Sequence, residues 1–363
     1  MSDTDDDRKD KAAIAPELSE RERQVLDAVV RTYVETAEPA GSRNVSRKFD
    51  LGVSPATVRN TMSDLEDKGY LFHPHASAGR IPTDRAYRFF VDQMIRPAPL
   101  SALERESLAR ELDPAGVAAL AVERLVRRAT RALSMLSTEL GVAIAPRLRE
   151  AVLEKLDLIR VSSDKVLMVA TLGGGLARTV YVDLPGEVPQ DTLLTVTTVL
   201  NERLAGRTLD EIQRSLPDRL RDVRTDESAA DELMNIFMQA GVELLDPAAI
   251  DGPDVHLGQT SVLAAQPEFQ AGERLKNLIE LTERRDLLAS VLGGRAHPDG
   301  LRITIGGEHG AEALADFTLV TAEYRVGSLK GVIGVIGPTR MPYEKVIAIV
   351  DYTSSLVNRI LAS

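Results

Sequence analysis

The sequence predicts an α+β protein with more than one domain. Its 363 residues exceed the size of one ordinary hydrophobic core, so two or three domains are expected. Residues 18–96 show helical spacing of apolar side chains around a short glycine-containing turn. Residues 97–145 are predicted to be a helical linker, and residues 146–363 alternate between strand-like runs and helical stretches.

The composition limits the class of protein. Hydrophobic residues make up 44% of the chain and charged residues 27%, which is typical of globular proteins. No apolar run approaches the roughly 18 residues of a membrane span, and the absence of cysteine excludes disulfides, thiolate zinc sites and thiol nucleophiles. A cytoplasmic protein that does not bind membranes is therefore expected. Residues 1–17 are acidic and are predicted to be a disordered tail.

The first predicted helix begins after Ser19, which forms a capping box with Glu22. Pro39 and Gly41 end this helix. Its apolar residues recur at helical spacing, namely Val25, Leu26, Val29, Val30, Tyr33 and Val34.

Two shorter helices follow, and they are joined by a tight turn. The second helix is predicted from Ser42 to about Phe49, and residues 51–53 form the turn. The third runs from Ser54 to about Lys68, with Pro55 in its first turn and a glycine after its end. This arrangement after a longer supporting helix is the helix-turn-helix pattern. An ordinary solvated helix in an unrelated helical domain would show the same pattern.

The third helix has a core face and an outer face. Val58, Met62 and Leu65 lie within about 60° of one another around the helix axis, so we expect them to face the core. The opposite face is small, polar and singly basic. It comprises Ala56, Asn60 and Ser63, with Thr57 and Arg59 on its flanks.

Such a face suits the major groove of double-stranded DNA. Arginine pairs bidentately with guanine and asparagine with adenine, while small residues let a helix approach closely. We predict base contacts from Thr57, Arg59 and Asn60, and contacts to the DNA backbone from Ser42, Arg43 and Arg80. The complete predicted DNA-binding set is Ser42, Arg43, Ser54, Ala56, Thr57, Arg59, Asn60, Ser63, His75, Ser77, Gly79 and Arg80.

Residues 71–83 are too rich in Pro, Gly and Ser for a helix, and their flanking apolar pairs predict two short strands around a loop. Thr83 caps a further helix, which prolines at 97 and 99 end. A loop in this place is the wing of a winged helix, and it can follow the DNA backbone or enter the minor groove. His73 and His75 lack a third ligand, so His75 is assigned to the wing surface and not to a metal.

The remaining chain is predicted to be mixed. Residues 100–140 are helical with a break at Asp113, and an apolar seam that extends to Leu140 suits packing against another helix. Strands are predicted at 153–163, 165–172, 178–184, 301–306, 317–326 and 329–337, and helices at about 189–205, 226–241, 270–292 and 343–361.

The charge of the chain is unusual for a protein that binds nucleic acid. The net charge is −11, yet residues 40–90 hold eight basic and five acidic side chains. DNA affinity must then depend on base contacts and on dimerisation more than on bulk charge.

No nucleophile lies near a base, and neither a phosphate-binding loop nor a dinucleotide fingerprint is present. We therefore predict no enzyme activity, catalytic residue, metal or cofactor.

Several segments together resemble one family. LSERERQVLDAVVRTYVETAEPAGSRNVSRKF, SPATVRNTMSDLEDKGYL and HPHASAGRIPTDRAYRFFVD are similar to the N-terminal part of the heat-inducible transcription repressor HrcA family. PEF at residues 267–269, ITIGGE and GVIGVIGPTRMPYEKVI resemble that family's C-terminal motifs. The chain departs from the family pattern at Ala86, where glycine is usual, and at His309, where asparagine is usual.

The resemblance implies a dimeric repressor of bacterial chaperone operons that binds an inverted-repeat operator. It implies a winged helix-turn-helix at 18–96, followed by a GAF-like α/β domain at 146–363 that is interrupted at about 190–260 by an inserted dimerisation domain. It also implies a homodimer whose activity is supported by the GroE-type chaperonin. GAF-like folds often hold small molecules, so a ligand-sensing transcription factor is the alternative.

Overall fold

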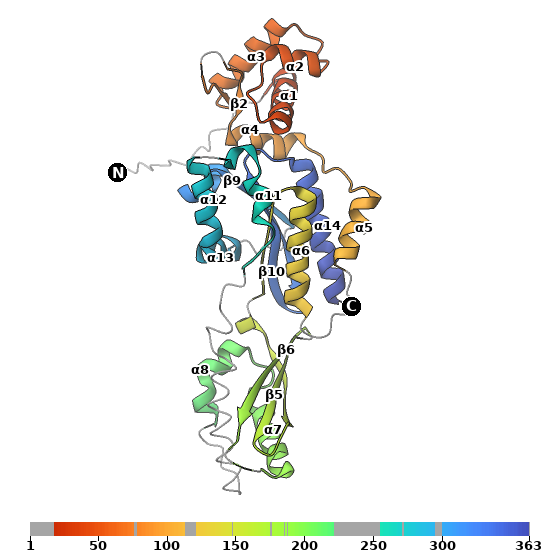
Figure 1. Ribbon diagram of the computed structural model, residues 1–363, viewed down its shortest axis with the longest axis vertical. Coiled ribbons are helices and arrows are strands. Elements are labelled where there is room, and N and C mark those ends of the chain that lie inside the picture. Colours follow the sequence, from red (N-terminus) through yellow and green to blue (C-terminus); the bar gives the residue numbers. More distant parts are fainter. Residues whose placement is uncertain are drawn as a thin grey trace, which may run out of the picture. The chain divides into compact units, whose positions relative to one another are not determined.

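The computed structural model describes residues 18–75, 78–112, 121–146, 148–174, 176–184, 186, 188–220, 255–270, 272–294 and 300–362 (Figure 1). The chain forms two compact units. The first consists of the described residues up to Arg96 with two distant segments, Ile305–Ala315 and Pro338–Glu344, and the second contains the rest. Helices and strands occur together in the chain, which confirms the α+β prediction. The predicted tail and the predicted helix at 226–241 lie outside the described residues.

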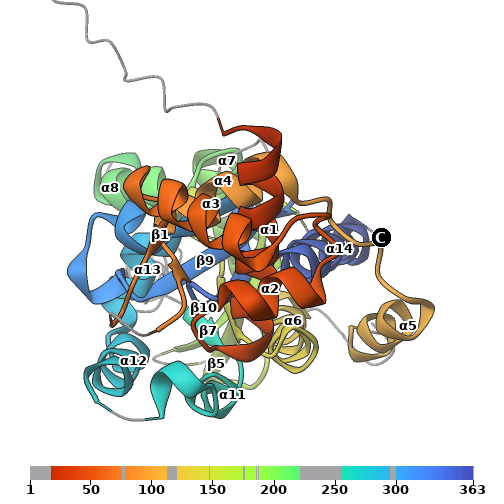
Figure 2. The same ribbon diagram turned by 90° about the horizontal axis from the view of Figure 1, so that it is seen from above.

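The first unit begins with three helices, α1 (Glu20–Thr36), α2 (Ser42–Lys48) and α3 (Pro55–Asp67) (Figure 2). The predicted capping box of α1 is present. The Ser19 hydroxyl accepts the backbone N–H of Glu22 at 3.4 Å, and the backbone N–H of Ser19 donates to the Glu22 carboxylate at 2.8 Å. These bonds satisfy two of the N–H groups that every helix start leaves without partners, which fixes where α1 begins.

A short hairpin and a fourth helix complete this part. Strand β1 (Leu71–Phe72) pairs antiparallel with β2 (Ile81–Pro82). Helix α4 (Asp84–Phe89) begins at the predicted cap Thr83 and continues as a π-helical turn, Phe90–Met94. The apolar faces of these elements bury a common core, to which each large side chain contributes about 1.5–3 kcal/mol. The core includes Val25, Leu26, Val29, Val45, Val58, Met62, Leu65, Tyr70, Leu71 and Tyr87.

The second unit contains a five-stranded sheet of order β7-β3-β10-β9-β8. Strand β3 runs antiparallel to both of its neighbours, β10 and β7. The sequence predicted the last three strands along the chain but neither β3 nor β7. The bounds are Leu140–Ile144 for β3, Val255–Leu257 for β7, Leu301–Ile305 for β8, Phe317–Val326 for β9 and Leu329–Pro338 for β10.

Helices and single turns surround this sheet. Helix α6 packs on β3 and β7 and lies beside α14 (Figure 1). The predicted helix through Leu140 ends earlier, at Ser137, because Thr138 adopts a positive φ of 61° and starts the turn into β3. The predicted helix at 270–292 is two helices that meet at Arg284. The bounds are Ala102–Glu111 for α5, Ala121–Ser137 for α6, Thr260–Ala264 for α11, Glu273–Glu283 for α12, Arg285–Gly293 for α13 and Tyr343–Ala362 for α14, with 3-10 turns at Leu148–Glu150, Pro267–Phe269, Gly306–His309 and Glu312–Leu314.

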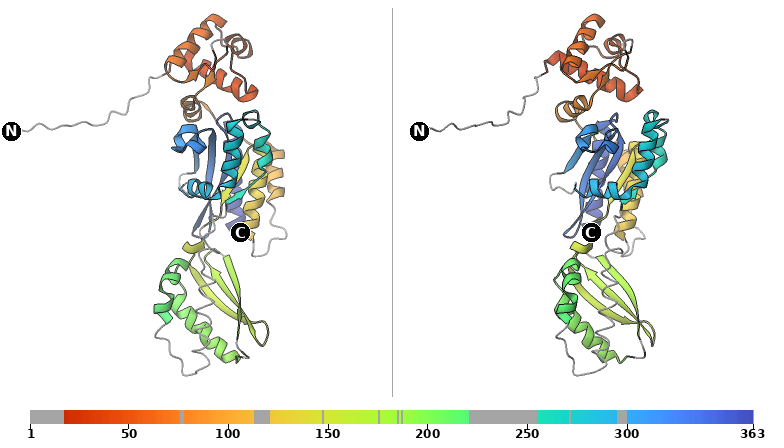
Figure 3. Two further views of the ribbon diagram at one scale, coloured as in Figure 1. Left: turned by 60° about the vertical axis from the view of Figure 1, so that its left-hand side comes forward. Right: turned by 90° about the vertical axis from the view of Figure 1, so that its left-hand side faces the viewer.

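A separate three-stranded sheet lies between β3 and β7 in the chain. Strands β4 (Leu153–Arg160), β5 (Lys165–Leu172) and β6 (Leu176–Asp183) form an antiparallel meander, and α7 (Gln190–Leu204) and α8 (Leu209–Leu220) lie on one of its faces (Figure 3). These elements share one hydrophobic core. Because β3 pairs with β7, the chain leaves the five-stranded sheet soon after residue 144 and returns to it at residue 255. Residue 190, where an insertion was expected to begin, lies within this segment between β3 and β7.

The described helices include none that is both long enough and apolar enough to cross a membrane.

Two glycines allow α6 to approach the edge of the five-stranded sheet. A Cβ on Gly141 would lie 2.0 Å from the carbonyl oxygen of Thr130, and a Cβ on Gly258 would lie 2.2 Å from the Ser134 hydroxyl. That hydroxyl accepts the backbone N–H of Gly141 at 2.7 Å and of Gln259 at 3.2 Å. The hydroxyl of one helical residue therefore bonds to both strand segments.

We expect Gly258→Ala to lower the free energy of unfolding by about 1–3 kcal/mol, because the added methyl group overlaps the helix and forces a backbone shift. Gly173→Ala is the matched control, since its Cβ would meet nothing closer than 3.8 Å. Urea unfolding of the two variants and the wild type measures the difference. Equal losses for both variants would show that close approach of α6 is not the constraint.

Candidate nucleic-acid interface

The outer face of α3, defined as Ala56, Arg59, Asn60 and Ser63, is exposed along its whole length. On the opposite side Val58, Met62 and Leu65 are at most 2% exposed, which confirms the predicted orientation of this helix. The side chains expected to meet a partner are therefore directed away from the core.

The start of α3 uses its hydroxyl groups to cap the helix. The Ser54 hydroxyl accepts the backbone N–H of Thr57 at 3.2 Å and lies 3.0 Å from the Thr57 hydroxyl. Thr57 is half-buried. Neither Arg59 nor Asn60 has a hydrogen-bond partner among the described residues, so their donors are available to a ligand.

Helix α2 packs beside α3 and carries further basic side chains. Ser42 is half-buried at its first turn, and Arg43 is exposed. Arg47 is also exposed, and the sequence analysis missed it as a candidate. The available signal was its position four residues after Arg43, which places both on one helical face. Lys48 is different, because it forms an ion pair with Glu35.

The hairpin is held against the connection between α1 and α2. The backbone N–H of Ala40 donates to the Arg80 carbonyl at 2.9 Å, and the N–H of Arg80 donates back at 3.0 Å. A Cβ on Gly79 would lie 2.5 Å from the Ala40 carbonyl, so only glycine permits this approach. His75 is exposed at the loop, and Ser77 lies outside the described residues.

Arg80, expected to contact the DNA backbone, is instead bound within the protein. The residue is only 8% exposed. Its Nη2 lies 2.7 Å from Glu66 Oε2 and its Nη1 lies 2.6 Å from His73 Nε2. The Nδ1 of His73 lies 2.9 Å from the other Glu66 oxygen. Arg80 therefore connects the hairpin to the last turn of α3.

The C-terminal end of α3 is fixed by charged side chains. Arg85 donates to the Lys68 carbonyl at 2.9 Å and its guanidinium lies 4.6 Å from the centre of the Tyr70 ring. The Lys68 ammonium bonds to Glu22 at 2.6 Å. Burial raises the pKa of Glu22, but the hydrogen bonds from Lys68 and Ser19 outweigh it, so the pKa is lowered below its usual value.

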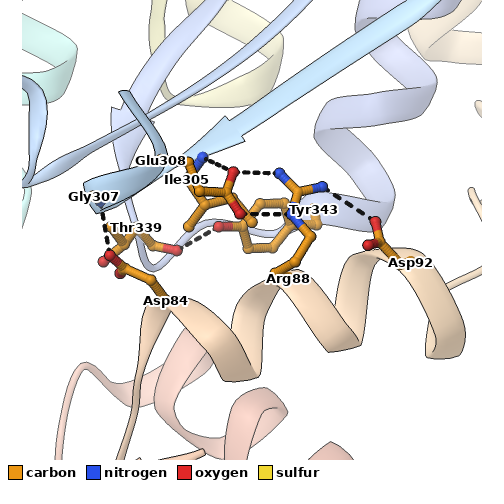
Figure 4. A network of polar contacts seen from close by, with 8 residues as sticks. All are labelled: Asp84, Arg88, Asp92, Ile305, Gly307, Glu308, Thr339 and Tyr343. Carbon is orange, nitrogen blue, oxygen red and sulfur yellow. Dashed lines mark hydrogen bonds and ion pairs between the residues drawn. The ribbon is translucent and has the colours of Figure 1, made fainter. Parts of the chain in front are cut away.

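Helix α4 binds one of the two distant segments of this unit (Figure 4). Arg88 makes a two-point contact with Glu308, with Nε to Oε1 at 2.7 Å and Nη2 to Oε2 at 2.5 Å. The Glu308 carboxylate also accepts the backbone N–H of Ile305 at 2.9 Å. One turn away, Asp84 accepts the N–H of Gly307 at 2.9 Å. These contacts join residues more than 200 positions apart.

The second distant segment bonds to α1. Arg340 donates to the Val34 carbonyl at 2.6 Å, in the last turn of the helix. Arg31 pairs with Glu344 at 2.8 Å. From the sequence, Arg340 beside its Pro/Gly turn was expected to have a structural role and not a catalytic one, and its bond to α1 agrees with that expectation. No role was predicted for Glu308 or Glu344, although both lie in the C-terminal segments ITIGGE and GVIGVIGPTRMPYEKVI that carry the family resemblance. Among the described residues, no group of three or more His, Asp and Glu side chains is placed to hold a metal ion.

The stability that Glu308 gives to the first unit should be lost in acid. Burial raises its pKa, but the hydrogen bonds from Arg88 and the N–H of Ile305 lower it below the ordinary value of 4.5. A lowered folded-state pKa means that the stabilisation is complete above about pH 4.5 and is lost as the pH falls through the folded-state value.

We expect Glu308→Gln to cost about 1–2 kcal/mol at neutral pH, a modest value because the carboxylate is 33% exposed. The difference from wild type should shrink below about pH 4.5. Glu312→Gln, an exposed residue of the same segment, is the control. Urea unfolding at pH 7 and pH 4 measures both, and a cost for Glu308→Gln that does not depend on pH would contradict this account.

Comparison with known proteins identifies the family. The model of the HrcA protein C-terminal domain matches residues 123–347. The heat-inducible transcription repressor HrcA of Chlorobium chlorochromatii is 35% identical over 347 residues, which cover 95% of this chain and 98% of that protein. The HrcA repressor of Geobacter sulfurreducens is 34% identical with the same coverage.

A crystal structure described as a hypothetical protein has a similar fold. Its TM-score is 0.66 with 21% identity, and the match covers 95% of this chain and 99% of that one. The family matches confirm the sequence-based resemblance and its interpretation as a repressor that is not an enzyme. The chain belongs to the HrcA family of heat-inducible transcription repressors.

Proposed function

We propose that this chain represses chaperone operons by binding a double-stranded inverted-repeat operator as a homodimer. In this proposal α1–α3 and the β1–β2 hairpin form a winged helix-turn-helix. The five-stranded sheet with its helices is a GAF-like α/β domain, and the segment containing β4–β6 is an inserted dimerisation domain. The exposed, polar outer face of α3, whose Arg59 and Asn60 have no partner among the described residues, is the observation that carries the proposal.

Helix α3 would enter the major groove with its outer face toward the bases. Arg59 would pair with guanine and Asn60 with adenine, since these side chains match the donor and acceptor pattern of those bases. Ala56 and Ser63 are small enough to let the backbone approach. Thr57 would also contact a base, as the sequence predicts, and Ser54 would lie at the helix start, where backbone N–H groups favour a phosphate.

The surrounding residues would position the duplex. Exposed Arg43 and Arg47 of α2 are available to phosphates, and Ser42 lies beside them. On the wing, His75 and Ser77 would meet the DNA backbone, while Gly79 would act by allowing the hairpin to pack closely. Phosphate contacts of this kind set the register of a protein on DNA without reading its sequence.

A second copy of the chain would pair through the outer face of the three-stranded sheet. Ile159, Leu167 and Tyr181 stand in one row across β4, β5 and β6. Ile159 is 51% exposed and Tyr181 is 67% exposed, so apolar surface remains on the face opposite α7 and α8. A two-fold axis through this face would present two copies of α3 and explain an inverted-repeat operator.

Heat induction would follow from loss of active repressor on warming. The proposal is that the GroE-type chaperonin supports the active form, and that other clients occupy the chaperonin during heat shock. The protein would act in the cytoplasm, where it meets the chromosome. Sensing of a small molecule by the α/β unit stays a prediction of the sequence.

The test of the proposed function is binding of the purified full chain to an inverted-repeat duplex from a chaperone promoter, against a scrambled duplex, at two salt concentrations. We expect a preference of about a thousandfold or more, with one dimer per site. Equal, salt-sensitive binding to both duplexes would show a general phosphate binder and would overturn the proposal.

Arg59→Ala should weaken operator binding by about 1–3 kcal/mol and relax the preference at one base pair, because a bidentate base contact is lost. Arg21→Ala removes the same charge from an exposed position of α1 and is the control. Titration of operator variants with each protein gives the result. If Arg59→Ala weakens specific and scrambled DNA equally, Arg59 is a phosphate contact instead.

Tyr181→Glu should shift the chain from dimer to monomer, because a charge placed in an apolar interface loses its hydration without gaining a partner. Leu103→Glu, at a 72% exposed position of α5, should leave the dimer intact. Sedimentation velocity distinguishes the two. A dimeric Tyr181→Glu variant of native stability would exclude this sheet face as the interface.

Purified chaperonin with its co-chaperonin and ATP should raise the fraction of repressor able to bind operator DNA after mild heating. Active-site titration with labelled operator measures that fraction. No change across a range of chaperonin concentrations would argue against chaperonin support.

A further inference from the structure

Three side chains from separate elements meet at the base of the hairpin. They are Glu66 in the last turn of α3, His73 just after β1, and Arg80 just before β2. We propose that these residues, named here the wing clamp, are positioning residues for DNA binding, which hold the β1–β2 hairpin at a fixed place relative to α3. The inference rests on the proposed function and assigns Arg80 to the protein side of the interface.

The geometry of the wing clamp defines a complete hydrogen-bonded cycle. A guanidinium has only donors, so at 2.6 Å from Arg80 the Nε2 of His73 must accept. The proton of the neutral ring is then on Nδ1, which donates to Glu66 at 2.9 Å. Glu66 completes the cycle by accepting Arg80 Nη2 at 2.7 Å through its other oxygen. Each of the three residues thus contacts both of the others.

The hairpin needs such support because its own pairing is minimal. Strands β1 and β2 are two residues each, with two paired positions, and an isolated hairpin of that length does not hold its shape in water. Arg80 supplies support on both sides. Its backbone bonds to Ala40, and its buried side chain bonds to α3. The orientation of β1 and β2 relative to α3 therefore depends on Arg80 and its partners.

Glu66 is an acidic residue whose expected effect on DNA affinity is opposite to the effect of its charge alone. An acidic side chain on a DNA-binding surface repels phosphates, so its removal should strengthen binding if it has no other role. In the wing clamp, Arg80 and His73 each donate to a different Glu66 oxygen. Glutamine has one acceptor oxygen, so one of the two donors loses its partner and faces an NH2 group, which lets the hairpin move. The proposal therefore predicts that removing this negative charge weakens DNA binding.

The experiment compares Glu66→Gln and Arg80→Lys in the full chain, with Asp67→Asn as the matched control. Asp67 is the next residue of α3 and is exposed, so its variant removes an equal charge without touching the clamp. Arg80→Lys keeps the positive charge but not the planar fork that reaches two partners. The readouts are affinity for the chaperone-promoter duplex, hydroxyl-radical protection of DNA flanking the base contacts, and backbone hydrogen exchange of residues 71–82.

We expect Glu66→Gln and Arg80→Lys each to weaken operator binding by about tenfold, to lose the flanking protection and to speed exchange in the hairpin. The protection under α3 should remain, and Asp67→Asn should bind at least as tightly as wild type. Glu66→Gln binding as tightly as wild type, with Arg80→Lys unchanged, would make Arg80 a phosphate contact and overturn the proposal.

The hydrogen-exchange readout separates this proposal from the proposed function. If the wild-type chain fails to prefer the inverted repeat, the proposed function fails whatever the variants do. The wing clamp is then judged on exchange alone, and unchanged exchange of residues 71–82 in Glu66→Gln overturns it.

Discussion

Two segments from the C-terminal part of the chain complete the first unit, and their hydrogen bonds and ion pairs hold helices α1 and α4 in place. Glu308 binds Arg88 of α4 at two points, while Arg340 and Glu344 bond to the second half of α1. Helix α1 in turn packs against α3. Charged groups that are about one-third exposed gain most when their geometry is bidentate, as it is for Arg88. The placement of the outer face of α3 thus depends on residues that follow β8 and β10 in the chain.

Most basic side chains of this unit are used inside the protein. Residues 40–90 hold eight basic side chains. Five of them bond to protein groups, namely Lys48, Lys68, Arg80, Arg85 and Arg88. The three without a partner among the described residues are Arg43, Arg47 and Arg59. With so few charges left without protein partners, the proposed DNA binding depends more on shape and base contacts than on bulk charge.

The sequence predicts structures that depend on contacts between residues close together in the chain. It does not predict structures that depend on contacts between residues far apart in the chain. Ser19, Ser54 and Thr83 start their helices where expected, because each cap is a contact with a residue three positions away. Strand β3 was missed because Leu140 fits a helical seam, and its pairing with β10 lies almost 200 residues ahead. The outer face of α3 followed from periodicity, whereas the burial of Arg80 depends on Glu66 across a loop.

Because the first unit is built from distant parts of the chain, it cannot complete its folding early in translation. Arg88 and its partner are 220 residues apart, and Arg31 and Glu344 are 313 apart. At common rates of synthesis, helices α1 and α4 wait about ten seconds to a minute before the segments that complete them are made. The first unit is therefore synthesised first but completes its folding among the last. Until residues 305–344 have been made, the nascent chain exposes the surfaces of α1 and α4 that these residues will cover, and a chaperone could bind there.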